Sequence, residues 1–223
     1  MSAGDHCREC EPWPESLARV RSAAILVPPA DGMVHALKYG GWPEMAAPMA
    51  RSMARHLVEL EGEAREGTLV PVPTTRKRMR TRGYNQAELL ARALGEGTGR
   101  PVLGLLVRHG SGGSQVALHR EERRANVRGE FRLAEGATVP NDGRPLVLVD
   151  DVLTTGATAS EIAEFLVASG ANDVRLLVFA RTLPGRTRDP SGGDEPPPGF
   201  FHAGRRPTGS TGLEPSSANQ GRS

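Results

Sequence analysis

The sequence predicts an α/β fold with a parallel sheet, because apolar runs and amphipathic stretches alternate along the chain. Leu146–Val149 is a continuous apolar run behind Pro145, which is typical of a strand buried on both faces of a parallel sheet. An amphipathic stretch follows and stops at Gly170, and Val174–Ala180 has the pattern of the next strand. Strand, helix and strand in this order form a βαβ unit with parallel strands. In such sheets, ligands bind beyond the carboxyl ends of the strands.

The elements before this unit follow from shorter patterns. Thr68–Val72 is a short β-like run. A helix is expected from Asn85, which has capping-box spacing with Glu88, to the glycine at Gly95. Val102–Val107 has the pattern of another strand.

The remaining segments complete the predicted domain. Val127–Leu133 alternates like a strand, and residues 108–126 form a polar loop rich in Gly and Arg. Loops of that length are usually lids, binding loops or disordered segments. Thr158 and Glu161 have capping-box spacing at the start of the helix that precedes Gly170.

Composition excludes several classes of protein. The 223 residues carry 28 Lys and Arg against 26 Asp and Glu, a formal charge of +2, so any site for an anionic polymer must be local. The first residues contain no apolar stretch typical of a signal peptide, and no apolar run approaches the ~18 residues that span a bilayer. We expect a soluble cytoplasmic protein without membrane insertion.

Three parts are expected along the chain. Residues 1–14 form an N-terminal segment, residues 15–183 form the folded domain, and residues 184–223 form a tail rich in Pro and Gly that we expect to be disordered. Cys7 and Cys10 in the first part have the spacing of a zinc knuckle but supply only half of a tetrahedral site. We therefore expect no bound zinc.

An acid pair and a hydroxyl-rich loop lie where the fold predicts a ligand. Adjacent strand side chains point to opposite faces, so Asp150 and Asp151 can reach one ligand only if the strand ends there, as we expect. The loop Thr154-Thr155-Gly156-Ala157-Thr158 then leads into a helix, whose free N–H groups and dipole suit a phosphate. Carboxylates beside a phosphate cradle suit the vicinal hydroxyls of ribose 5-phosphate.

Two other nucleotide-binding motifs do not fit the sequence. A buried strand that ends in acids also describes a Walker B element, but neither Lys38 nor Lys77 follows a glycine, so the chain has no P-loop. The glycines of Gly110–Gly113 lack the last position of the dinucleotide fingerprint.

Several motifs carry a resemblance to a known family. Leu146–Thr158 resembles the 5-phosphoribosyl-1-pyrophosphate (PRPP) signature of type I phosphoribosyltransferases: four apolar residues, two acids, two variable residues and Thr-Thr-Gly-x-Thr. Over roughly Cys7 to Arg181 the chain is similar to the ComF/GntX-like competence-protein family of these enzymes. The motifs that carry this likeness are Ala36–Gly41, Val70–Pro73, Arg82–Leu90, Ser114-Gln115 and Arg123–Phe131.

The resemblance implies a type I phosphoribosyltransferase-like parallel sheet of about five strands flanked by helices, with a hood or flexible loop over the site. It implies Mg²⁺-bound PRPP as substrate, from which an unknown acceptor displaces pyrophosphate at the anomeric carbon. The implied site residues are Asp150, Asp151 and Arg82 as catalytic residues; Thr154, Thr155, Gly156, Ala157 and Thr158 for the 5-phosphate; Val72, Pro73, Thr74 and Thr75 for pyrophosphate; and Arg120, Arg123, Arg124 and Asn126 in the flexible loop.

The basic cluster Arg76–Arg82 leaves three interpretations open. It can stabilise a departing pyrophosphate, bind single-stranded DNA, or form a solvated loop. The expected partners are PRPP and its acceptor, with single-stranded DNA, competence proteins and a second copy of the chain as candidates. The alternative function is a PRPP- or nucleotide-sensing module, or a DNA-uptake accessory protein, without catalysis.

Overall fold

The computed structural model describes residues 14–17, 19–62, 66–108 and 130–183. Cys7 and Cys10, the tail from residue 184 to 223, and the predicted loop residues Arg120, Arg123, Arg124 and Asn126 lie outside the described residues. No helix in the described part of the chain has the length and apolar character needed to cross a membrane.

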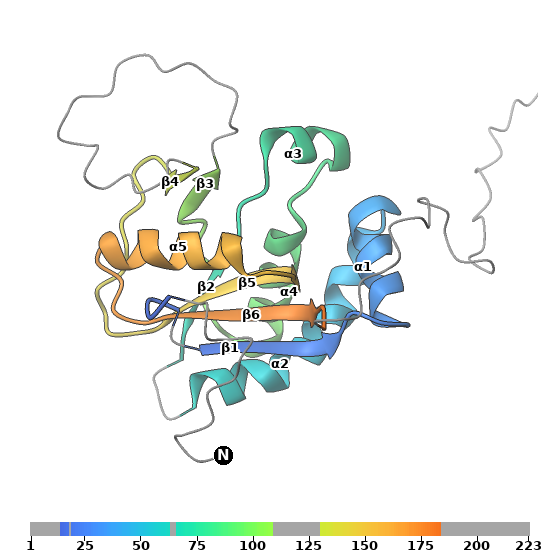
Figure 1. The fold of residues 1–223 in the computed structure, drawn as a ribbon, viewed down its shortest axis with the longest axis horizontal. Helices are drawn as coiled ribbons and strands as arrows, with labels where there is room; N and C mark the ends of the chain where they lie inside the picture. The colour runs from blue at the N-terminus through green and yellow to red at the C-terminus, as the bar shows by residue number, and fades with distance from the viewer. Residues whose placement is uncertain (1–13, 18, 63–65, 109–129, 184–223) are drawn as a thin grey trace, which may run out of the picture. The chain divides into compact units, whose positions relative to one another are not determined.

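Four parallel strands form the central sheet (Figure 1). Their order across the sheet is β1 (Arg19–Ile25), β6 (Val174–Arg181), β5 (Leu146–Leu153) and β2 (Thr68–Pro71). Within the ranges that the structure describes, each neighbouring pair in this sheet is parallel, which confirms the predicted α/β fold with a parallel sheet.

A fifth segment meets the sheet only at one residue. Val102 forms an isolated parallel bridge with Leu69 of β2. The predicted strand Val102–Val107 is therefore wrong as a continuous strand, because the chain leaves the sheet after this bridge. It becomes β3 (Leu106–Arg108), which pairs antiparallel with β4 (Phe131–Leu133) in a separate small sheet.

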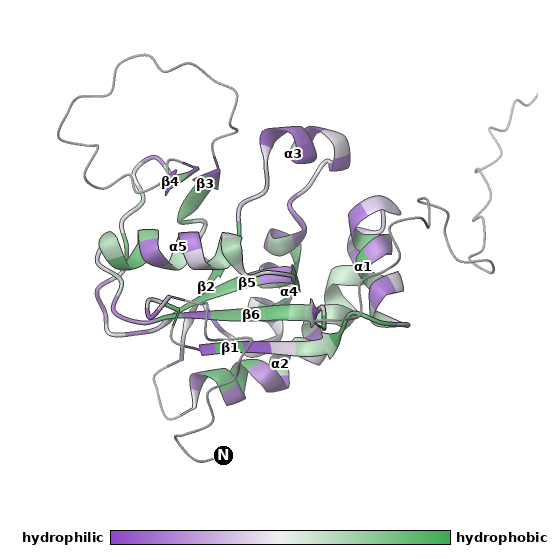
Figure 2. Cartoon of the chain, viewed as in Figure 1, coloured by the Kyte–Doolittle hydropathy of each residue, from purple (hydrophilic) through white to green (hydrophobic). Residues whose placement is uncertain are grey.

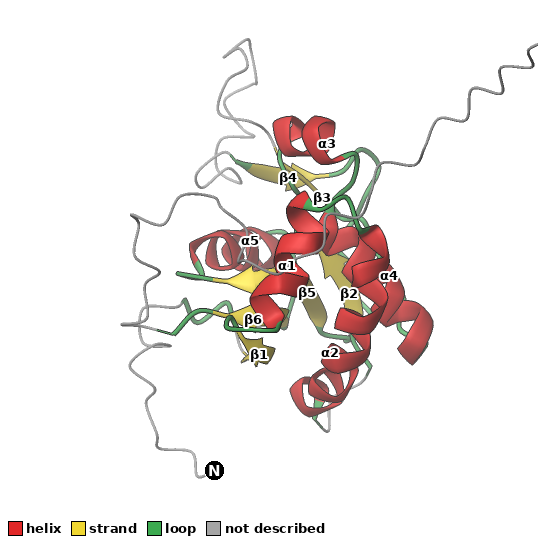
Figure 3. Ribbon diagram, turned by 90° about the vertical axis from the view of Figure 1, so that its right-hand side faces the viewer, coloured by secondary structure: helices red, strands yellow, loops and turns green. Residues whose placement is uncertain are grey.

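Helices cover both faces of the central sheet (Figure 3). On one face, α5 (Ala157–Ala168) packs its apolar side against alternate residues of β5, including Leu146 and Leu148. On the other face, α1 (Ala30–Tyr39), α2 (Ala46–Glu61) and α4 (Gln86–Thr98) share a core with Val147 and Val149. Both faces of β5 are buried at these four residues, as the continuous apolar run predicts.

A short helix, α3 (Arg76–Arg82), follows β2 and stands at the same end of the domain as β3 and β4 (Figures 1 and 3). Figure 2 shows the contrast between the hydrophilic α3 and the hydrophobic strands β5 and β6. The basic cluster is thus helical and not a loop. A single 3₁₀ turn, η1 (Pro43–Met45), joins α1 to α2.

The start of α4 is close to the prediction, but its cap differs. The Asn85 side chain caps the helix by accepting a hydrogen bond of 3.2 Å from the backbone N–H of Ala87. Glu88 does not complete the capping box, since its carboxylate accepts a 2.6 Å bond from Arg92 one turn later. The helix also continues through Gly95 to Thr98, where Gly99 ends it with φ of +74°.

The start of α5 differs from the prediction in a similar way. Gly156, with φ of +78°, is the N-cap residue and has no side chain with which to cap the helix. Thr158 therefore lies in the first turn and does not form a capping box with Glu161. A left-handed backbone at this position favours glycine, because other residues have a Cβ that clashes there.

Candidate functional site

The acid pair lies inside β5 and not at its end. β5 continues to Leu153 because β6 stays paired with it as far as Arg181. The predicted strand end at the acids is therefore wrong. The neighbouring strand β2 is the one that stops, with Pro71 opposite Val149. Asp150 and Asp151 thus stand just beyond the end of β2, at the carboxyl edge of the sheet where a ligand site is expected.

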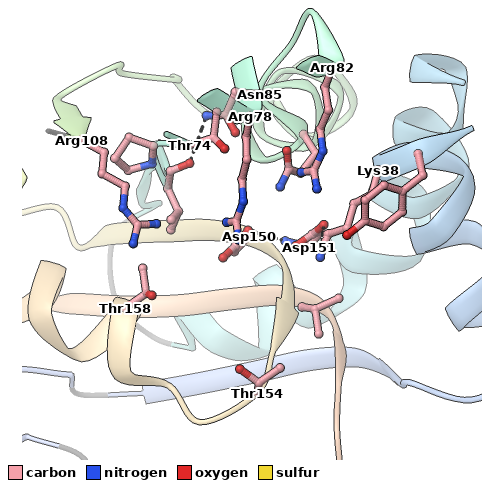
Figure 4. Close-up of a pocket in the computed structure, with 15 residues that line it drawn as sticks. Lys38, Thr74, Arg78, Arg82, Asn85, Arg108, Asp150, Asp151, Thr154 and Thr158 are labelled. Atoms are coloured by element: carbon pink, nitrogen blue, oxygen red, sulfur yellow. Dashed lines mark hydrogen bonds and ion pairs between the residues drawn. The ribbon is translucent and has the colours of Figure 1, made fainter. Parts of the chain in front are cut away.

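A cavity of about 340 Å³ opens above this edge (Figure 4). Its walls come from α1, the β2–α3 connection, α3, α4, β3, β5 and the start of α5. The lining residues are Lys38, Tyr39, Val72, Pro73, Thr74, Arg78, Arg82, Asn85, Gln86, Arg108, Asp150, Asp151, Val152, Thr154 and Thr158.

Cations surround the acid pair in this cavity. In Figure 4, the Arg78 side chain extends from α3 toward Asp150, and Arg82 extends from the same helix toward the side of the cavity where Lys38 lies. Arg108 enters from β3 and also pairs with Glu130, at 2.9 Å. Four cationic side chains against two carboxylates make the cavity suited to a polyanion.

Asp151 is the buried member of the acid pair. Its carboxylate Oδ2 lies 2.9 Å from the Lys38 Nζ, and the two side chains are 3% and 21% exposed. Lys38 belongs to the last turn of α1, so this ion pair joins α1 to β5 across the open end of the sheet.

Asp150 has a different environment. Its Oδ1 accepts a hydrogen bond of 2.8 Å from the backbone N–H of Asp151. Burial, and then the neighbouring Asp151 charge, raise the pKa of Asp150 to about 8, although this backbone hydrogen bond and Lys38 act in the opposite direction. At pH 7 its carboxyl group is therefore mostly protonated and can donate as well as accept a hydrogen bond.

Three buried polar atoms of the lining have neither a hydrogen bond nor an ion pair among the described residues. They are Thr74 Oγ1, Arg82 Nη1 and Gln86 Oε1. Buried polar groups in folded proteins are nearly always hydrogen-bonded, and exceptions cluster at functional sites. A hydroxyl, a guanidinium nitrogen and an amide oxygen together suit a ligand that both donates and accepts hydrogen bonds.

Hydrogen bonds hold the walls of the cavity together. Asn85 Nδ2 donates to the backbone carbonyl of Val72 at 3.0 Å, and Tyr84 donates its hydroxyl to the carbonyl of Leu37 at 2.6 Å. The Arg82 guanidinium carbon lies 5.0 Å from the centre of the Tyr39 ring, a cation–π contact. These contacts connect α1 to the segment between β2 and α4.

The structure brings most of the predicted site residues that it describes into one cavity. Those that line it are Asp150, Asp151, Arg82, Val72, Pro73, Thr74, Thr154 and Thr158. Thr75 does not line it, because its hydroxyl caps α3 by accepting from the N–H of Arg78 at 3.2 Å. Thr155, Gly156 and Ala157 are also not among the lining residues, and the Thr155 hydroxyl accepts from the N–H of Ala157 at 3.4 Å.

The sequence pattern singled out neither Lys38 nor Arg108 as a site residue, and it included Arg78 only within the basic cluster Arg76–Arg82, for which pyrophosphate binding was one of three interpretations. Lys38 is one of only two lysines in the chain, which is a signal that could have drawn attention to it. Arg78 and Arg82 are four residues apart and thus share a helix face, which would follow from recognising α3 as a helix. Nothing in the sequence pattern places Arg108 against the acid pair.

Comparison with curated proteins finds several relatives. The chain is 31% identical over 181 residues to the DNA utilization protein YhgH of Escherichia coli K12, covering 79% of this chain and 78% of the relative. The chain is 32% identical to YhgH of Salmonella typhi, again over 79% of this chain and 78% of the relative. Competence protein F of Haemophilus influenzae is 35% identical over 51% of this chain and 49% of its own. No family model matches the chain.

Among solved structures, the chain is similar to an adenine phosphoribosyltransferase, with 17% identity and a TM-score of 0.40 over 64% of this chain and 72% of that one. It is also similar to glutamine PRPP amidotransferase from B. subtilis, with 18% identity and a TM-score of 0.40 over 60% of this chain and 26% of that one.

Proposed function

Because the chain belongs to the family of YhgH and the ComF competence proteins, we propose that it is a phosphoribosyltransferase that uses Mg²⁺-bound PRPP. An acceptor would displace pyrophosphate from the anomeric carbon of the ribose. The observation that carries the proposal is the cavity itself, in which an acid pair at the carboxyl edge of the sheet faces cationic side chains on α1, α3 and β3.

The two kinds of side chain match the two kinds of group on PRPP. Carboxyl groups accept hydrogen bonds from ribose hydroxyls, which is the role we assign to Asp151 and Asp150. Phosphate groups prefer cations and backbone N–H groups. Thr154 and Thr158 line the cavity next to the first turn of α5 and would hold the 5-phosphate, whereas Arg78 and Arg82 would hold the pyrophosphate.

The reaction follows from these positions. A lone pair of the acceptor forms a bond to the anomeric carbon, and the bond from that carbon to pyrophosphate oxygen breaks with its electron pair on the departing group. Negative charge grows on pyrophosphate, which Arg78 and Arg82 stabilise, and positive charge grows on the sugar, which the Asp151 carboxylate stabilises. The cavity thus acts by positioning and electrostatics.

Magnesium enters as part of the substrate. The described residues contain no group of three or more His, Cys, Asp or Glu side chains that could hold a metal ion by themselves. Mg²⁺ is commonly bound through substrate phosphates and water, so this arrangement fits delivery of the ion on PRPP.

The test is release of pyrophosphate from PRPP and Mg²⁺ in a screen of nucleobases, amines and ammonia as acceptors. We expect one class of acceptor to support release by the wild-type protein, and Asp151→Asn to lower it at least tenfold. Binding of PRPP without release for any acceptor would favour the alternative function, a non-catalytic PRPP sensor. Failure to bind PRPP would refute both.

A role with single-stranded DNA is a second candidate. The relatives are named for DNA utilization and competence, and α3 exposes three cations that do not line the cavity: Arg76, Lys77 and Arg80. Exposed cations of this kind suit a nucleic-acid backbone. Such binding would use the outer face of α3 and would not compete for the acid pair.

A further inference from the structure

Lys38 has a contact that the proposed reaction does not yet explain. Its side chain reaches from the last turn of α1 to the floor of the cavity, where its Nζ lies 2.9 Å from Asp151 Oδ2. Apart from this ion pair, Asp151 Oδ2 has no hydrogen-bond partner among the described residues. The Asp151 side chain is only 3% exposed, so water does not replace the missing partner. The ammonium group of Lys38 is therefore the one polar group that the described residues place against Asp151 Oδ2.

The acid pair needs a nearby cation. Two adjacent carboxylates in a poorly solvated place cannot both ionise without compensation, because burial and like charge each favour the protonated form. Asp150 shows both effects, since burial and the Asp151 charge raise its pKa while Lys38 lowers it. Lys38 thus offsets the charge of Asp151 and decreases the repulsion on Asp150.

Other groups face the acid pair, but none takes the place of Lys38. Among the residues that the structure describes, the charged or titratable side chains that line the cavity around the acids are Lys38 and Tyr39 from α1, Arg78 and Arg82 from α3, and Arg108 from β3. Of the ion pairs recorded for the described ranges, only that with Lys38 involves Asp150 or Asp151. Arg78 and Arg82, which have no ion pair among those recorded for the described ranges, therefore stay available for the anionic groups of a ligand.

We propose that Lys38 is a positioning residue of the phosphoribosyl site, which holds Asp151 ionised and oriented toward the ribose hydroxyls. This inference rests on the proposed function, because it assigns Asp151 the ribose. It adds that α1, an element outside the phosphate loop and the acid-bearing strand, sets the charge state of the site. Lys38 acts through Asp151 and not by contact with the transferred group.

The first test measures the acid pair in the ligand-free protein. Carbon-13 NMR of the Asp carboxyl groups gives titration curves for wild type, Lys38→Met and Lys38→Arg. Loss of the charge in Lys38→Met should raise the titration midpoint of the pair by about one pH unit or more, and Lys38→Arg should keep it close to wild type. An unchanged midpoint in Lys38→Met would overturn the proposal.

The second test measures the affinity for PRPP and Mg²⁺ against pH. We expect Lys38→Met to bind at least tenfold more weakly at pH 7 and to regain affinity at higher pH, with Lys38→Arg nearer to wild type. Lys38→Met leaves the buried Asp151 carboxylate without its partner, which can unfold the protein. The control is the double variant Lys38→Met with Asp151→Asn, which leaves no unpaired buried charge.

The double variant also separates the two ways in which Lys38 could act. If Lys38 acts through Asp151, adding Lys38→Met to Asp151→Asn should change PRPP affinity by less than about twofold. A further tenfold loss in that background would mean that Lys38 contacts the ligand directly, and the proposal would be wrong. If wild type does not bind PRPP, the proposed function fails, whereas the NMR titration still decides whether Lys38 controls the acid pair.

Discussion

Asp150 and Asp151 have different surroundings although they are neighbours in the chain. Asp151 is buried against Lys38, and Asp150 is partly exposed and bonded to the Asp151 backbone. The strand alternation sends their side chains in different directions, and the end of β2 leaves both of them beside the same cavity. A single residue type thus supplies one group that is paired with a cation and one whose pKa is raised by burial and by its neighbour.

The raised pKa of Asp150 predicts a pH dependence of stability. Its pKa is about 8 in the folded protein and about 3.9 when unfolded, so the folded state binds the proton more tightly. This contribution to stability is fully present below about pH 4 and is lost as pH rises through about 8. We expect the free energy of unfolding of Asp150→Asn to decrease less than that of wild type between these pH values.

Urea unfolding of the ligand-free protein at a series of pH values checks this expectation. At pH 8 the free energy of unfolding of Asp150→Asn should exceed that of wild type by on the order of 2 kcal/mol. This is less than the full pKa shift of Asp150 would give, because water reaches the Asp150 side chain. Parallel curves for wild type and Asp150→Asn would show that Asp150 titrates normally.

At the scale of elements, α3 has two basic faces. Arg78 and Arg82 line the cavity, whereas Arg76 and Arg80 lie on the exposed part of the helix outside it. The Thr75 cap starts the helix and Gly83, with φ of +83°, ends it. The short helix therefore distributes one basic segment of sequence between two surfaces.

This arrangement predicts that equal changes of charge on α3 have unequal effects. Arg78→Gln with Arg82→Gln should lower PRPP affinity at least tenfold, because charge-assisted contacts to pyrophosphate are lost. The matched control, Arg76→Gln with Arg80→Gln, should keep PRPP affinity within about twofold and weaken any binding of a fluorescent single-stranded oligonucleotide. Equal losses of PRPP affinity in both variants would indicate a general electrostatic effect and no specific contact.

At the scale of the whole molecule, the sequence was most informative where a pattern is local. The continuous apolar run of β5 predicted a strand buried on both faces, and the Thr- and Gly-rich segment after it predicted the turn into α5. The cap at Asn85 was also local and was found. The βαβ rule then predicted that β6 follows α5 and runs parallel to β5.

The parts that were not predicted depend on contacts between distant segments. The end of β5 is set by β6 and the end of β2, so the run of apolar residues alone could not locate it. Lys38 reaches Asp151 across more than a hundred residues of sequence. α2 is different, since the spacing of Met49, Met53, Leu57 and Leu60 is helical and could have predicted it.

The most direct test of a phosphoribosyl site is calorimetric titration of wild type and Asp151→Asn with PRPP in the presence of Mg²⁺. We predict saturable binding at one site by wild type and at least tenfold weaker binding by the variant, a difference of about 1.4 kcal/mol. No binding by the wild-type protein, or equal affinity in Asp151→Asn, would contradict the assignment of this cavity to PRPP.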